Sequence, residues 1–180
     1  MRITEGNTLA LVIDYQEKLI PVINNNEEVV KNTEILIKGL RELEIPIFVS
    51  QQYTKGLGET IAPVKEALGE FNPYEKVSFS LWGTEEIREA IKAENKKNVI
   101  VCGVEAHICV LQTVIDLIEN GFNVFLVEDC IGSRKANDKK FECKRAVREG
   151  AFLTTYEAAL YELTAGAGTP HFKAISKLTK

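Results

Sequence analysis

Short apolar runs alternate along the chain with longer stretches in which apolar residues recur every three or four positions. The runs predict six buried strands, at residues 9–14, 45–50, 77–79, 99–102, 122–128 and 152–154. The periodic stretches predict helices, at residues 27–44, 64–68, 85–94, 138–149 and 157–163, with a further helix starting at residue 108. Alternating strands and helices indicate the α/β class, a three-layer doubly wound parallel sheet of six strands. Right-handed crossovers then give a Rossmann-like strand order of 3-2-1-4-5-6.

The stretch 98–113 stands at the centre of this pattern. Its apolar run stops at Gly103, and helical spacing begins at Ile108, so Cys109 falls in the first turn of a helix that follows a buried strand. The unpaired N–H groups and the positive dipole end of a first turn favour thiolate. We therefore expect a lowered pKa for Cys109, which makes this residue the first candidate for chemistry.

Asp14 and Lys76 are the candidate partners of this thiol. In the order 3-2-1-4-5-6, strands 1 and 4 are neighbours, so the topology brings Asp14, which ends strand 1, and Cys109 to one crevice. Lys76 stands at the start of strand 3 and could supply a nearby positive charge, while Asp14 could accept the thiol proton. Each residue also has an ordinary interpretation: a small buried hydrophobe for Cys109, a loop-capping acid for Asp14 and a solvated lysine for Lys76.

The composition narrows the possible functions. A chain of 180 residues with 45% hydrophobic residues suits a single domain spanning 1–180. A formal net charge of -4 argues against nucleic-acid binding. No signal peptide and no apolar run of about 20 residues is present, so we expect no membrane contact and a cytoplasmic protein with reduced thiols. Four cysteines without CxxC spacing, two histidines and no glycine-rich nucleotide motif indicate neither a metal nor a cofactor.

Several motifs in one order resemble those of the isochorismatase-like cysteine hydrolase superfamily. They cover nearly the whole chain and consist of the strand ending in Asp14, KVSFSLW after Glu75, GVEAHICVLQT, VEDCIGSR and EGAFLTTYEAALYEL. The GVEAHIC motif and the segment Pro170–Lys173 (PHFK) resemble most closely the isochorismatase domain-containing proteins.

The resemblance implies a triad in which Cys109 is the nucleophile, Asp14 the general base and acid, and Lys76 an electrostatic partner. It also implies a cis peptide between Val104 and Glu105, with the N–H groups of Glu105 and Cys109 forming an oxyanion hole. The implied reaction is cofactor-free attack on a small amide or related carbonyl compound, followed by hydrolysis of a thioester. The partner would be a small-molecule substrate, and a homo-oligomer is expected from the family.

Departures from the family pattern limit the substrate. Nicotinamidases of this superfamily carry an Asp-x-His metal site where this chain has Gln51-Gln52-Tyr53, which disfavours a metal-dependent nicotinamidase. True isochorismatases lack the cysteine, so Cys109 argues against that reaction. By their positions alone, the candidate substrate contacts are Gln16, Gln51, Tyr53, Trp82, Glu105 and His107.

Two other classes of protein stay open. A non-catalytic binding or scaffold protein could retain this fold, because the sequence carries no obvious substrate signature. A thiol redox sensor is disfavoured, because no resolving cysteine lies near Cys109 in the sequence.

Overall fold

The computed structural model describes residues 1–180 and contains one sheet of six parallel strands. The strands are β1 (Thr8–Ile13), β2 (Ile47–Gln52), β3 (Tyr74–Lys76), β4 (Asn98–Val104), β5 (Asn123–Gly132) and β6 (Phe152–Thr154). Their order, β3-β2-β1-β4-β5-β6, confirms the predicted doubly wound sheet. β1 and β4 are neighbours and every residue of both is buried, which explains why they read as continuous apolar runs.

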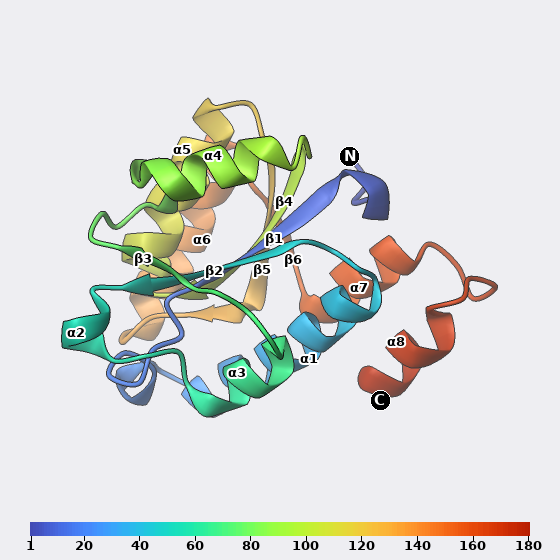
Figure 1. Ribbon diagram of the computed structural model, residues 1–180, viewed down its shortest axis with the longest axis horizontal. Coiled ribbons are helices and arrows are strands. Elements are labelled where there is room, and N and C mark those ends of the chain that lie inside the picture. The colour runs from blue at the N-terminus through green and yellow to red at the C-terminus, as the bar shows by residue number, and fades with distance from the viewer.

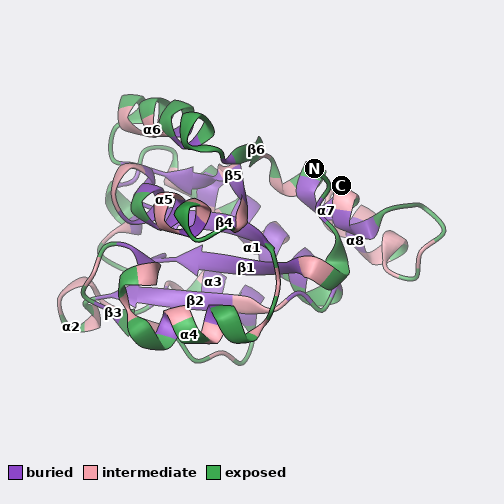
Figure 2. Cartoon of the chain, turned by 90° about the horizontal axis from the view of Figure 1, so that it is seen from above, coloured by how far each residue is buried: buried purple, intermediate pink, exposed green.

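Helices cover both faces of this sheet (Figure 1). The helices are α1 (Asn26–Glu42), α2 (Thr54–Leu57), α3 (Ala62–Leu68), α4 (Glu85–Ala93), α5 (Leu111–Glu119), α6 (Ala136–Glu149), α7 (Tyr156–Thr164) and α8 (Phe172–Leu178). α1, α3, α7 and α8 share one hydrophobic core with one face of the sheet, and α4, α5 and α6 share a second core with the other. Figure 2 shows the buried strands running between the exposed outer sides of these helices. No helix is long and apolar enough to cross a bilayer.

Two predicted strands are placed differently by the structure. The third strand is Tyr74–Lys76 instead of residues 77–79, and Val77 is 79% exposed while Lys76 is buried. Tyr74–Lys76 pairs with the end of β2, and the apolar residues after it belong to an irregular segment, so an apolar alternation alone gave the wrong register. β5 runs to Gly132, beyond the predicted end at residue 128, because its last residues pair with β4 after a bulge.

Candidate active site

Asp14 lies directly after β1, at the carboxyl end of the sheet. Its backbone has φ of 55°, a left-handed conformation that aspartate tolerates better than most residues and that ends the strand abruptly. The side chain is fully buried. Ser50 of the neighbouring strand β2 donates a hydrogen bond to Asp14 Oδ1 at 2.7 Å, which compensates part of the cost of burying the carboxylate.

Lys76 ends β3 and forms a buried ion pair with Asp14, in which Nζ lies 2.7 Å from Oδ2. Nζ also donates to Gln52 Oε1 at 2.6 Å and to the carbonyl oxygen of Phe79 at 3.0 Å. An ammonium group has three N–H donors, so these three acceptors use all of them. Lys76 is therefore a fixed charge, with no donor left for a substrate.

Cys109 lies in a π-helical turn, Ala106–Val110, which joins β4 to α5. The thiol side chain is only 6% exposed. The pKa of Cys109 is raised to about 12, mainly by burial; the charge of Asp14 also raises the pKa, and Lys76 lowers it. The three residues therefore meet in one place, but the expected lowering of the pKa is wrong. The effect of desolvation on the pKa of Cys109 is larger than that of the helix terminus. In addition, the charge of Lys76, which was expected to stabilise a thiolate, is balanced by the charge of Asp14.

The chain passes very close to β1 just before this turn. Gly103 has φ of 150°, and a Cβ atom there would stand 2.4 Å from Cβ of Ile13. The next peptide bond, Val104–Glu105, is cis, as the family resemblance implies. The carbonyl of Glu105 accepts hydrogen bonds from the N–H groups of Ile108 at 3.0 Å and Val110 at 3.3 Å. The N–H of Glu105 itself donates to no acceptor within the chain.

Three polar residues around the triad were missed by the sequence analysis. Ser50 and Gln52 hold Asp14 and Lys76 from β2, and their polar side chains at the end of an apolar strand were the available signal. Thr113 donates to the carbonyl oxygen of Cys109 at 2.7 Å and accepts from the N–H of Leu81 at 3.1 Å. Thr113 thereby ties the segment after β3 to the turn that carries Cys109. No local sequence pattern indicates that connection.

Gln16 and Gln51 hold the loop that follows β2. The amide of Gln16 donates to the carbonyl oxygens of Gln52 at 2.9 Å and Gly58 at 2.7 Å, and its oxygen accepts from the Gln52 N–H. The oxygen of Gln51 accepts from both the N–H and the hydroxyl of Thr60. These hydrogen bonds give both glutamines a loop-positioning role, and their contact with substrate stays a prediction.

The two aromatic candidates lie in different places. Tyr53 is half-exposed after β2, and its ring covers Gly56, where a Cβ atom would stand 2.3 Å from a ring carbon. Trp82 packs against Phe122, with ring centroids 5.5 Å apart. Phe122 follows the last turn of α5, whereas Cys109 precedes the first turn. The observed partner of Trp82 is thus an aromatic ring at the far end of α5, and its contact with substrate stays a prediction.

Glu105 and His107 face the side of β5. Glu105 Oε2 accepts hydrogen bonds from the backbone N–H of Arg134 at 3.0 Å and from its Nε at 3.1 Å. His107 Nδ1 lies 3.0 Å from the hydroxyl oxygen of Ser133, and its Nε2 lies 3.9 Å from Asp138. These contacts form a polar border beside the turn Ala106–Val110.

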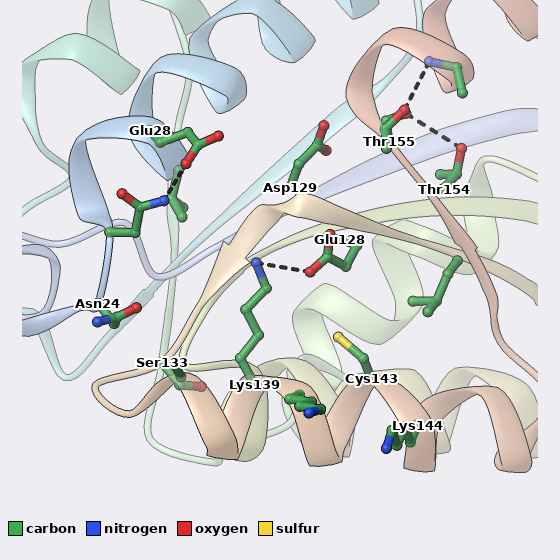
Figure 3. A pocket seen from close by; sticks show the side chains of 16 residues that line it. Asn24, Glu28, Glu128, Asp129, Ser133, Lys139, Cys143, Lys144, Thr154 and Thr155 are labelled. Atoms are coloured by element: carbon green, nitrogen blue, oxygen red, sulfur yellow. Dashed lines mark hydrogen bonds and ion pairs between the residues drawn. The ribbon is translucent and has the colours of Figure 1, made fainter.

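A separate cavity of about 950 Å³ lies at the carboxyl ends of β5 and β6 (Figure 3). An ion pair between Glu128 and Lys139, 3.2 Å long, stands inside it beside Asp129. None of the triad residues lines this cavity. No three histidine, cysteine or acidic side chains of the chain form a group that could hold a metal ion.

Comparison with known proteins places the chain in a family. A family model described as the isochorismatase domain matches residues 8–158. Isochorismatase domain-containing protein 2 of Danio rerio is 40% identical over 176 residues, which are 97% of this chain and 87% of that protein. The solved structure described as the MAR1 ribonuclease of Caenorhabditis elegans is also 40% identical, with a TM-score of 0.93 over 99% of this chain and 92% of that one.

The same fold occurs in a more distant structure, the YcaC gene product of Escherichia coli, described as an octameric hydrolase of unknown specificity. It has a TM-score of 0.93 at 22% identity and covers 99% of this chain and 89% of its own. The matched domain takes up most of the sequence, and the predicted resemblance is confirmed. This chain belongs to the isochorismatase family and has its hydrolase fold.

Proposed function

We propose that the protein is a cysteine hydrolase that acts on a small amide or related carbonyl compound through a thioester intermediate. The observation that carries this proposal is the buried ion pair of Asp14 and Lys76, 2.7 Å long, in the same crevice as the thiol of Cys109. Burying a charge pair costs desolvation energy. Such a pair beside a potential nucleophile is typical of an active site, where charged groups are kept for catalysis.

The raised pKa of Cys109 suggests how the reaction starts. Because the resting group is a thiol, Asp14 takes its proton as the sulfur attacks the carbonyl carbon. The N–H groups of Glu105 and Cys109 stabilise the oxyanion, and the unused N–H of Glu105 supports this role. Asp14 then returns the proton to the leaving amine, and an acyl group stays on sulfur. Water, deprotonated by Asp14, hydrolyses this thioester and regenerates the thiol.

Lys76 lies against Asp14 as its buried counter-ion. Its three donors are held by Asp14, Gln52 and Phe79, so we assign it an electrostatic role and no contact with substrate. Tyr53 and His107 remain candidates for substrate contact beside this centre, together with the two glutamines. A single catalytic domain, a homo-oligomeric state and a cytoplasmic location also stay predictions.

The decisive experiment is turnover of a panel of small amides by wild type, Cys109→Ser and Cys143→Ser. We expect loss of turnover only in Cys109→Ser, together with an acyl adduct on the Cys109 peptide of wild type in mass spectrometry. Cys143 is a matched control because it is also a buried free thiol but lies on α6. Full turnover by Cys109→Ser would contradict the proposal.

A second candidate function comes from the description of a relative. The Caenorhabditis elegans structure that is 40% identical to this chain is described as a ribonuclease. The formal net charge of -4 disfavours RNA as a substrate, because RNA-binding surfaces are normally basic. Cleavage of single-stranded RNA by wild type but not by Cys109→Ser would favour this candidate. If Cys109 neither turns over amides nor cleaves RNA, a non-catalytic binding role becomes the better interpretation.

A further inference from the structure

The cavity at the carboxyl ends of β5 and β6 is a second place where a small molecule can bind. Its walls come from α6 on one side and from the first turns of α1 and α7 on the other (Figure 3). Its volume of about 950 Å³ lies within the range of about 300–1,000 Å³ that is usual for ligand sites. Because no triad residue lines the cavity, a ligand here would not occupy the proposed active site.

The wall formed by α6 is positively charged. This helix carries five basic and three acidic residues, although the whole chain has a formal net charge of -4. The charge of Lys139 is balanced by Glu128, 3.2 Å away. Lys140 and Lys144 also line the cavity, about one helical turn apart, and neither forms an ion pair with an acid of the chain. Two unpaired ammonium groups at this spacing favour a ligand group with several anionic oxygens, such as a phosphate.

The strand ends add an acceptor of the opposite charge. Asp129 lies on β5, and its side chain points away from α6 (Figure 3). Its Oδ1 accepts the backbone N–H of Tyr156 at 2.9 Å, and its Oδ2 accepts no hydrogen bond from the chain. A carboxylate repels a phosphate but accepts hydrogen bonds from hydroxyl groups. No aromatic side chain lines the cavity, so a nucleobase would have no ring to stack on. The lining therefore favours a ligand with a phosphate at one end and hydroxyl groups at the other.

We propose that this cavity is a second binding site, separate from the triad, that takes a small phosphorylated sugar or polyol. Lys140 and Lys144 bind the phosphate, and the carboxylate of Asp129 accepts hydrogen bonds from the hydroxyl groups. The inference does not depend on the proposed hydrolase function, because it concerns binding at residues that take no part in that reaction.

The experiment measures binding of three probes by calorimetry. Sorbitol 6-phosphate carries both recognised groups, sorbitol lacks the phosphate, and inorganic phosphate lacks the polyol. None of the three has an aldehyde that could condense with a lysine. The proteins are wild type, the double variant Lys140→Met/Lys144→Met, Asp129→Asn and Arg148→Met. Arg148→Met is the matched control, because Arg148 is also an exposed base of α6 without an acidic partner but does not line the cavity.

Wild type should bind sorbitol 6-phosphate more tightly than either of the other probes. The double variant should lose at least about tenfold in affinity for it, the size of one charge-assisted hydrogen bond, and Arg148→Met should keep the wild-type affinity. Asp129→Asn should weaken sorbitol 6-phosphate without weakening inorganic phosphate. Absence of binding by wild type would overturn the inference, and so would unchanged affinity in Asp129→Asn. Equal losses in the double variant and Arg148→Met would also overturn it, because they would indicate diffuse attraction by the surface of α6.

A thiol of the chain reports where the probe binds. Cys143 projects from α6 into the cavity without contributing a charge, whereas Cys109 lies at the triad (Figure 3). Sorbitol 6-phosphate should slow the alkylation of Cys143 by iodoacetamide at pH 9 and leave the rate at Cys109 unchanged, as read by peptide mass spectrometry. Protection of Cys109 with no effect at Cys143 would overturn the inference, because the probe would then bind at the triad. Protection of Cys143 supports the second site even if Cys109 turns over no amide, which would affect only the proposed function.

Discussion

The two sides of β4 differ in how their polar groups are satisfied. On the side of β1 to β3, Asp14 and Lys76 are fully buried and every donor of Lys76 has an acceptor. On the side of β5 and β6, Arg134 has free donors and a cavity of about 950 Å³ opens between the strand ends and α6. The first side suits chemistry that needs a dry, fixed charge pair, and the second has room and unused charge for recognition.

The largest effect should come from removing the buried ion pair on the side of β1 to β3. Lys76→Met leaves the Asp14 carboxylate buried without its partner, so we expect a loss of about 3–5 kcal/mol in the free energy of unfolding. Urea denaturation of wild type and Lys76→Met measures this free energy. Lys140→Met, which removes an exposed lysine at the cavity, should stay within about 0.5 kcal/mol of wild type. Equal losses in the two variants would contradict the difference between the two sides.

The second effect concerns the pKa of Cys109, raised to about 12 mainly by burial. The alkylation rate of the folded protein should rise about tenfold per pH unit from pH 8 to 10, because thiolate is still scarce there. In urea the alkylation rate should level off once the pH exceeds the reference cysteine pKa of about 8.5. The unfolded thiol ionises first, so this residue also lowers stability as the pH rises above about 9 towards 12. A plateau below pH 8 in the folded protein would contradict this account.

The sequence was sufficient for the parts of the site that depend on topology. Parallel strands in the order 3-2-1-4-5-6 bring the ends of strands 1 and 4 together, so the sequence alone could pair Asp14 with Cys109. Lys76 was selected from its position beside strand 3, although that strand lies three residues earlier than predicted. These predictions succeeded because chain order and strand adjacency decide them.

The energetic properties of the site could not be predicted in the same way. The pKa of Cys109 depends on how much water the fold removes and on the contact between Asp14 and Lys76, which local sequence does not record. Trp82 was selected by position alone, and its packing against Phe122 is a tertiary contact that local sequence does not record. Arg134 was not selected because its fixed position comes from Glu105, 29 residues earlier.

A smaller effect compares two serine hydroxyls, one on each side. Ser50→Ala removes a hydrogen bond to the charged Asp14, and we expect a loss of about 1.5–3 kcal/mol in the free energy of unfolding. Ser133→Ala removes the contact with His107 and should cost about 0.5–1.5 kcal/mol at pH 8. Thermal and urea unfolding of both variants provide the values. The interpretation fails if Ser133→Ala proves the more damaging change.

The smallest expected effect tests whether the cavity on the side of β5 and β6 is hydrated. The ion pair between Glu128 and Lys139 is 3.2 Å long, but the two side chains are 47% and 24% exposed. Water should therefore screen it, and a double-mutant cycle of Glu128→Gln and Lys139→Met should give a coupling of about 0.2–1 kcal/mol that falls with added salt. A coupling above about 2 kcal/mol, insensitive to salt, would mean that this edge of the sheet is as dry as the triad. The contrast between the two sides of β4 would then lose its physical basis.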